Sequence, residues 1–216
     1  MLNEVKVVAF DCDGVMFDTA EANRAYYNHI LAHFGRPPMD EEQLHFVHAH
    51  TLHQSLEHLF ADEAERREAL AFRATMDYGL FLRYLTIEPT LIGLLDWMRE
   101  RFKTAIATNR TDTMDRLLRE YGLLERFDLV VTSLDVKRPK PSPDPLLKIL
   151  THFGIGPRQA VFVGDSAIDE ATARAAGVWF VAYCNPALDA DRHIGSLKEL
   201  EAMLGGAVQN RRISGE

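Results

Sequence analysis

Two aspartates stand two residues apart near the start of the chain, in Phe10-Asp11-Cys12-Asp13-Gly14. They follow a short β-branched apolar run, and side chains two apart on an extended segment point to the same side. Asp11 and Asp13 can therefore face one ligand, which indicates metal binding, nucleophilic attack or both. The alternative is a strand that simply ends in turn-forming residues, because Asp-Gly is a common turn pair.

A second acidic pair lies in Val163-Gly164-Asp165-Ser166-Ala167-Ile168-Asp169. Asp165 again follows an apolar run, and Asp169 falls in the first turn of the helix expected next. Ser166 could cap that helix, and Asp169 could merely complement its dipole. Four aspartates at one edge of a sheet would repel one another without a cation, however, and carboxylate oxygens favour Mg²⁺.

Two further segments offer groups that could hold a phosphate. Thr108-Asn109-Arg110 follows another apolar run and supplies a hydroxyl, an amide and a turn. Lys140 lies in the proline-rich stretch Lys137-Arg138-Pro139-Lys140-Pro141-Ser142-Pro143, where a stiff backbone could hold its charge against an anion. Taken alone, each segment is more often a solvated surface loop.

These groups need elements that bring them together, and the apolar pattern predicts such elements. Continuous apolar runs are typical of strands buried on both faces of a parallel sheet. They occur at Val5–Phe10, Thr104–Thr108, Leu129–Ser133, Ala160–Val163 and Trp179–Tyr183. Helical stretches are expected at Thr90–Arg101, Thr113–Tyr121, Asp144–Phe153, Ser166–Ala176 and Ser196–Leu204. This alternation predicts an α/β protein with a Rossmann-like open parallel sheet, which binds ligands at the carboxyl ends of its strands.

The first predicted strand is followed by a long helical stretch. Residues from about 17 to 85 read as helix after helix, and a structureless connection of that length would be unusual. We therefore expect an α/β core formed by residues 1–15 and 86–205, with an inserted α-helical cap at 16–85 above the carboxyl edge of the sheet. Residues 206–216 lack apolar periodicity and are expected to form a flexible tail.

In order and spacing, the four segments resemble the motifs of the haloacid dehalogenase (HAD) superfamily. These motifs are the D-x-D-G-V opening, a threonine after the second strand, a K-P lysine and G-D-S-x-x-D, and the resemblance covers the chain from about Val5 to Gly177. The resemblance implies a phosphoaspartyl mechanism. Asp11 would attack phosphorus, while Asp13 would protonate the leaving oxygen and then deprotonate the water that hydrolyses the intermediate.

The same resemblance implies a cofactor and the residues around it. Mg²⁺ would lie between the Asp11 carboxylate, the Asp13 carbonyl oxygen and Asp165, and Asp169 would orient these groups. The transferring phosphoryl oxygens would be held by Thr108, Asn109 and Lys140.

Residues present and absent separate the branches of this superfamily. Dehalogenases that attack carbon lack the second acid of the opening motif, which is present here as Asp13. Phosphonoacetaldehyde hydrolases use a lysine of the cap, and no lysine occurs between Lys6 and Lys103. Both activities are therefore disfavoured.

The choice between a phosphatase and a mutase depends on fewer residues. The β-phosphoglucomutase branch typically reads E-D-S where this chain has Gly164-Asp165-Ser166, and it usually lacks an acid at the position of Asp169. Thr108-Asn109-Arg110 resembles the T-N-K/R of phosphoglycolate phosphatases. The resemblance thus favours hydrolysis of a small phosphoglycolate-like phosphomonoester. The alternatives are a sugar phosphomutase and a catalytically silent binding protein on the same scaffold.

Composition limits the partners of the protein. The 216 residues include 24 Lys+Arg and 32 Asp+Glu, and the net charge of −8 argues against a general nucleic-acid binder. No apolar run approaches the roughly 20 residues that cross a bilayer, and Cys12 and Cys184 have no metal-binding or redox spacing. We expect a cytoplasmic monomer or homodimer that acts on a small phosphorylated metabolite, without nucleic-acid or membrane partners.

Histidines are concentrated in the expected cap, where seven of the nine lie between His29 and His58. Most are expected to be surface or half-buried residues, and the alternatives are contact with the leaving group or a second metal site. The cap also holds six arginines that could bind an anion and that the sequence does not rank: Arg24, Arg36, Arg66, Arg67, Arg73 and Arg83.

Overall fold

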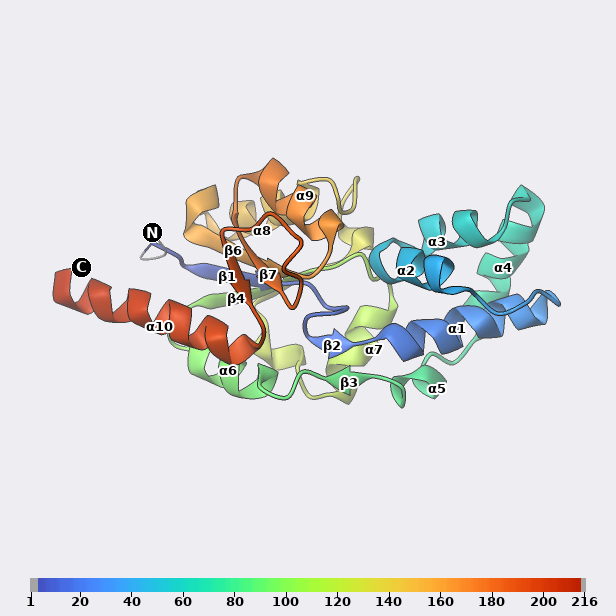
Figure 1. Cartoon of the computed structure of the whole chain (residues 1–216), viewed down its shortest axis with the longest axis horizontal. Coiled ribbons are helices and arrows are strands. Elements are labelled where there is room, and N and C mark those ends of the chain that lie inside the picture. The colour runs from blue at the N-terminus through green and yellow to red at the C-terminus, as the bar shows by residue number, and fades with distance from the viewer. Residues whose placement is uncertain (1–3, 215–216) are drawn as a thin grey trace.

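A six-stranded parallel sheet forms the centre of the computed structural model, which describes residues 4–214 (Figure 1). The strand order is β5-β4-β1-β6-β7-β8. The strands are β1 (Val7–Phe10), β4 (Lys103–Ala107), β5 (Leu129–Val131), β6 (Ala160–Gly164), β7 (Trp179–Tyr183) and β8 (Arg192–Ile194). Because β1 pairs with β4 on one side and β6 on the other, the three segments that follow these strands meet at one edge of the sheet.

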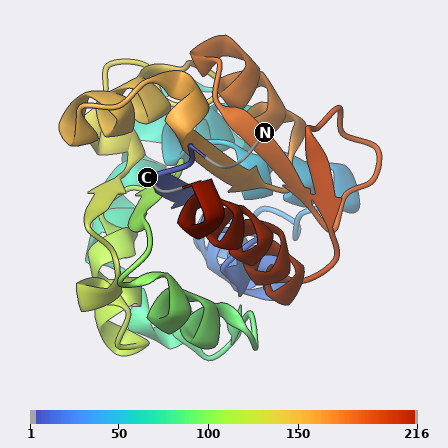
Figure 2. The same ribbon diagram turned by 90° about the vertical axis from the view of Figure 1, so that its left-hand side faces the viewer.

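Helices cover both faces of this sheet (Figure 2). One face carries α8 (Asp144–Phe153) and α9 (Ala167–Ala176), and the other carries α6 (Leu91–Met98), α7 (Thr113–Glu120) and α10 (Leu197–Ser214). Three short 3₁₀ helices lie in the connections, at Leu124–Arg126, Ser133–Asp135 and Pro157–Gln159. Strand β1 is buried on both faces, since its alternate residues join the two different apolar clusters. The predicted α/β fold class is confirmed.

Five helices lie beyond the carboxyl ends of the strands, at the right of Figure 1. They are α1 (Ala20–His33), α2 (Glu41–Ala49), α3 (Leu52–Leu59), α4 (Glu63–Thr75) and α5 (Gly79–Leu82). These helices, called the cap below, enclose an apolar core of their own in which Ile30 and Phe60 are fully buried. The sequence pattern of this region led us to expect such a helical unit.

Short strands are where the structure differs from the sequence analysis. The pair β2 (Phe17–Asp18) and β3 (Thr86–Ile87) is antiparallel and joins the cap to the core, although no strand was expected between Phe10 and Thr104. Strand β8 was also missed. Two-residue strands have no readable period, and β8 begins with the exposed residues Arg192 and His193, so neither resembles a buried strand.

The C-terminal segment also differs from its prediction. Helix α10 continues through Gly205 and Gly206 to Ser214, where a flexible tail was expected from residue 206. The two glycines weaken a helix, but no proline follows them to end it. Positions 215 and 216 lie outside the described residues. No helix within residues 4–214 is both long and apolar enough to cross a membrane.

Candidate active site

The end of β1 brings the first two aspartates to the carboxyl edge of the sheet. Asp11 continues the strand, since its backbone N–H donates to Val163 O at 2.9 Å. Cys12 turns into the core and is fully buried, and burial raises the pKa of its thiol. Gly14 has a φ of +78°, and a Cβ placed there would lie 2.0 Å from Asp165 Oδ2. The loop after β1 can therefore approach Asp165 only with glycine at this position.

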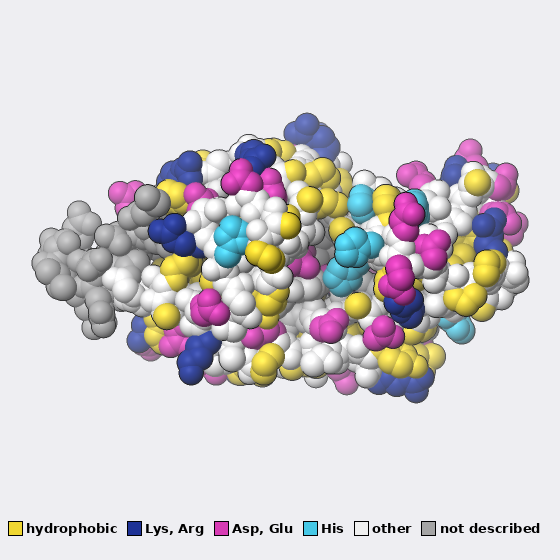
Figure 3. Space-filling model, in the orientation of Figure 1, with side chains coloured by type: hydrophobic (Ala, Val, Ile, Leu, Met, Phe, Trp, Pro, Cys, Tyr) yellow, Lys and Arg dark blue, Asp and Glu magenta, His cyan; other side chains and the backbone are white. Residues whose placement is uncertain are grey.

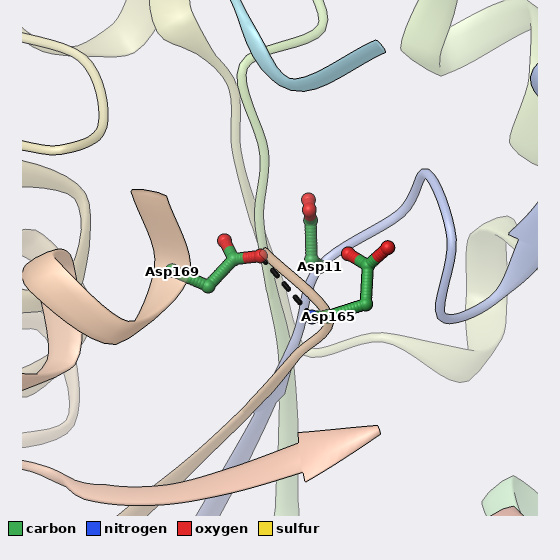
Figure 4. A group of neighbouring side chains, drawn as sticks. All are labelled: Asp11, Asp165 and Asp169. Carbon is green, nitrogen blue, oxygen red and sulfur yellow. Dashed lines mark hydrogen bonds between the residues drawn. The ribbon is translucent and has the colours of Figure 1, made fainter. Parts of the chain in front are cut away.

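Three carboxylates gather at this edge (Figure 4). One oxygen from each of Asp11, Asp165 and Asp169 lies within 4.8 Å of the others. Asp165 follows β6, and Asp169 lies in the first turn of α9, where its Oδ2 accepts from Ser166 Oγ at 2.6 Å and from the Asp165 N–H at 3.3 Å. The helix-capping interpretation of this segment is therefore correct, and it coexists with a place in the acidic cluster.

The electrostatics of the cluster fit a divalent cation. Burial and the neighbouring charge of Asp169 raise the pKa of Asp165 to about 7. The same two causes raise the pKa of Asp11 well above its ordinary value, although Lys140 opposes them. Buried carboxylates that repel one another and offer only oxygen ligands are a donor set that suits Mg²⁺.

Lys140 lies between two of these carboxylates. Its Nζ is 2.8 Å from Asp11 Oδ1 and 2.6 Å from Asp169 Oδ1, and its side chain is 2% exposed. Burial opposes the charge of Lys140, but the two carboxylates outweigh burial and raise its pKa. Asn109 fixes the backbone of this segment, because its Nδ2 donates to Lys140 O at 3.1 Å. The lysine is thus held as a buried cation beside Asp11.

The segment after β4 places its three side chains differently. Thr108 is buried, and its Oγ1 accepts from the Arg110 N–H at 3.2 Å. Asn109 Nδ2 also donates to Ala49 O of the cap at 3.1 Å. Thr108, Asn109 and Lys140 all line the cavity that contains Asp11 and Asp13. The structure therefore brings together the side chains that the sequence analysis assigned to the phosphate.

Arg110 is a residue whose contacts the sequence analysis missed. Its Nε donates to Asp13 Oδ2 at 2.8 Å and its Nη2 to Asp13 Oδ1 at 2.7 Å, while Nη1 donates to the Tyr78 hydroxyl at 2.5 Å. Burial raises the pKa of Asp13, but the charge and hydrogen bonds of Arg110 outweigh burial, and the net change is a lowered pKa. The sequence signal for these contacts was the position of Arg110 directly after Thr108-Asn109. That position served above only for the comparison with the T-N-K/R of phosphoglycolate phosphatases.

The cap closes one side of this cavity, which encloses about 60 Å³. Its wall includes Tyr26, Tyr78, His48 and His50 from the cap. Of the six arginines that the sequence left unranked, Arg73 reaches this wall. The cavity is thus small, polar on the core side and lined by aromatic and cationic groups on the cap side.

Most cap histidines pack against aromatic rings. His29 and His33 stack on Phe72, and His50 and His58 stack on Phe46. Histidines gather on the surface near the border between cap and core (Figure 3). Within the described part of the chain, the acidic cluster is the one close group of three side chains able to ligate a metal, and it contains no histidine.

The structure combines a parallel α/β sheet, a helical cap, and a buried lysine and clustered aspartates at the carboxyl edge of the sheet. This combination is the one that the resemblance to haloacid dehalogenase-like hydrolases predicts. The model of the family "Haloacid dehalogenase-like hydrolase" matches residues 8–183, and the chain belongs to this family. The predicted membership is confirmed.

Three similar proteins come from different bacteria. A HAD-superfamily hydrolase of subfamily IA, variant 1, from Geobacter sulfurreducens has a crystal structure with a TM-score of 0.76 and 41% identity, covering 93% of this chain and 97% of its own. A phosphoglycolate phosphatase of Chromobacterium violaceum is 30% identical over 92% of this chain and 96% of its own length. The pyrophosphatase PpaX of Bacillus velezensis is 30% identical over 80% of each chain.

Proposed function

We propose that the protein is a Mg²⁺-dependent phosphatase that hydrolyses a small phosphoglycolate-like phosphomonoester through an aspartyl-phosphate on Asp11. The observation that carries this proposal is the position of Asp11: its carboxylate lies 2.8 Å from Lys140 Nζ and forms a close group with Asp165 and Asp169. A carboxylate held among a buried cation and metal-ligating oxygens is suited to attack phosphorus.

The chain's own residues divide the proposed reaction between them. Asp11 attacks phosphorus, and Asp13 gives a proton to the leaving oxygen and later takes one from the attacking water. Because Arg110 lowers the pKa of Asp13, the acid role requires that bound substrate weaken the contact between Arg110 and Asp13. Lys140 and Thr108 hold the phosphoryl oxygens while charge develops on them. The Asn109 side chain supports this site by donating to Lys140 O and Ala49 O. Mg²⁺ held by the Asp11 and Asp165 carboxylates and the Asp13 carbonyl oxygen would neutralise charge between carboxylate and phosphate. Asp169 positions Lys140 and Ser166 beside this group.

The similar proteins support a small substrate, since one is a phosphoglycolate phosphatase and another a pyrophosphatase. Tyr26 and Tyr78 of the cap line the cavity on the side where the leaving group would lie. Pyrophosphate is the second candidate, because a pyrophosphatase is as similar to this chain as a phosphoglycolate phosphatase is. All residues of the proposed site come from one chain, which is compatible with a monomer or a homodimer acting on a phosphorylated metabolite in the cytoplasm.

The test is phosphate release from a panel of substrates in the presence of Mg²⁺. The panel contains 2-phosphoglycolate, pyrophosphate, hexose phosphates and nucleoside monophosphates. We expect a clear preference for phosphoglycolate or pyrophosphate, and a loss of about 10⁴-fold or more in kcat for Asp11→Asn, because the nucleophile is removed. Circular dichroism checks that the variant is folded.

Three results would refute the proposal. Wild-type turnover by a folded Asp11→Asn variant would exclude Asp11 as nucleophile. Conversion of a hexose phosphate to its isomer, without release of phosphate, would identify the sugar phosphomutase that was the alternative. Release of phosphate from no member of the panel would favour a binding protein.

A further inference from the structure

Two arginines line the catalytic cavity on the side that faces the cap. Arg110 follows β4 in the core, and Arg73 lies in the last turn of α4 in the cap. Their side chains are 7% and 14% exposed, so neither is an ordinary solvated surface charge. The proposed phosphate ligands do not include either of them, and their function needs a separate explanation.

The contacts of the buried cations divide the cavity into two ends. Lys140 contacts Asp11 and Asp169, so its charge lies at the end of the nucleophile. Arg110 contacts Asp13, the proposed acid, and Tyr78 of the cap. The attacking and leaving oxygens lie roughly in line during phosphoryl transfer. The leaving group therefore points away from Asp11, toward Asp13, Arg110 and the cap.

The wall at this end is continuous and offers donors for an anion. The ring of Tyr78 contacts that of Tyr26 with centroids 5.7 Å apart, and the Tyr26 hydroxyl accepts from Arg73 Nε at 2.7 Å. A guanidinium has five N–H donors, and Asp13 engages the Nε and Nη2 groups of Arg110. The same guanidinium can hold a second acceptor beside the Tyr78 hydroxyl, which can itself donate.

We propose that Arg110 and the Tyr78 hydroxyl bind an anionic group on the leaving group, so that the enzyme selects phosphomonoesters whose leaving group carries a second negative charge. This inference rests on the proposed function and narrows it, because charge and not only size selects the substrate. With a neutral leaving group, Asp13 would be the one charged acceptor that these contacts give Arg110, and the Tyr78 hydroxyl would face an uncharged group. Arg73 continues this wall toward α4, where its charge is offset by an ion pair with Asp112.

The test compares 2-phosphoglycolate with 2-phosphoglycolamide, which has the same shape but no charge on its leaving group. The readout is the ratio of the two kcat/KM values, measured for wild type, Arg110→Gln, Arg110→Lys and Tyr78→Phe. Arg119→Gln is the matched control, since Arg119 is an exposed arginine on α7 paired with Asp115. The ratio is the correct readout because Arg110 also holds Asp13, and its loss will lower turnover of both substrates.

We expect wild type and Arg119→Gln to prefer the acid by about 10- to 100-fold, the value of a hydrogen bond to a charged group. The ratio should fall close to one in Arg110→Gln and keep an intermediate value in Arg110→Lys, which retains charge without the planar fork. Tyr78→Phe keeps Arg110 and should lower the ratio severalfold.

The outcomes separate this inference from the proposed function. If wild type hydrolyses both substrates with equal kcat/KM, the protein is a phosphatase that does not select for a charged leaving group, and the inference is wrong. An unchanged ratio in Arg110→Gln would show that Arg110 acts on the transferring phosphoryl group or on Asp13 alone, and would also overturn the inference. Release of phosphate from neither substrate by wild type would refute the proposed function itself.

Discussion

Gly164 contributes no functional group, yet its missing side chain decides where Asp169 can lie. A Cβ at position 164 would be 2.4 Å from Asp169 Cβ and 2.6 Å from its Cγ. Asp169 is fully buried and contacts both Lys140 and Ser166, so it has no room to retreat. The sequence analysis used glycine at 164 and an acid at 169 as two separate marks against a mutase. The structure makes them one steric requirement.

This requirement gives a prediction for Gly164→Ala. The added methyl group must push Asp169 away from Lys140, and we expect kcat/KM to fall about 10- to 100-fold, as for other residues that orient metal ligands. Gly93→Ala is the control, because Gly93 is exposed in α6 with no atom within 4 Å of an added Cβ. Full activity of Gly164→Ala in the same assay would mean that the position of Asp169 does not matter.

Among the elements, those buried on both faces were predictable and those held by tertiary pairing were not. Strands β1, β4, β6 and β7 carry continuous apolar runs, and the sequence placed them within a few residues of their observed ends. Their carboxyl ends fix the positions of Asp11, Thr108 and Asp165, so most of the site followed from strand prediction alone. Strands β2 and β3 exist because the cap must leave and rejoin the core, and no local pattern records that.

Helix α9 links an element to the site, because its N-cap residue also binds Asp169. Ser166 Oγ donates to Asp169 Oδ2 at 2.6 Å and accepts from the Asp169 N–H at 3.2 Å. Ser166→Ala should therefore lower the free energy of unfolding by about 1 kcal/mol and also reduce kcat/KM. The stability is measured by urea denaturation.

The matched control for this change is Thr151→Ala. Thr151 is exposed within α8, where its hydroxyl donates to Leu147 O instead of capping the helix. Its replacement should leave stability within about 0.5 kcal/mol of wild type. Equal effects of the two substitutions would contradict the capping role of Ser166.

At the scale of the whole molecule, the cap and the core meet through contacts between distant parts of the chain. Arg73 on α4 forms an ion pair with Asp112 before α7, and Asn109 after β4 donates to Ala49 O at the end of α2. Arg110 reaches Tyr78 in the same way. Each partner alone resembles a surface residue in the sequence, since only the folded arrangement brings the two together. The sequence could therefore predict that a cap exists. It could not predict which cap residues contact the core and complete the site.

The balance of charge across the molecule also gives the pH dependence of its stability. Burial and Asp169 raise the pKa of Asp165 from its ordinary value of 3.8 to about 7. Between these values Asp165 binds more protons in the folded protein without metal than in the unfolded chain. Its contribution to the free energy of unfolding should therefore fall as the pH rises from about 4 to about 7. Mg²⁺ binds ionised carboxylates and should reverse this loss.

Thermal and urea unfolding in EDTA and in Mg²⁺, each at pH 5 and pH 8, measure the two effects together. At a Mg²⁺ concentration of about 100 times its Kd at pH 8, the gain in unfolding free energy at that pH should be about 2.7 kcal/mol. The same Mg²⁺ concentration should give a smaller gain at pH 5, because protons compete with Mg²⁺ at the lower pH. In Asp165→Asn both the pH slope and the Mg²⁺ gain should shrink, since the residue that titrates is also a ligand. Equal stabilisation by Mg²⁺ at both pH values, or in wild type and Asp165→Asn, would place the cation elsewhere than in the acidic cluster.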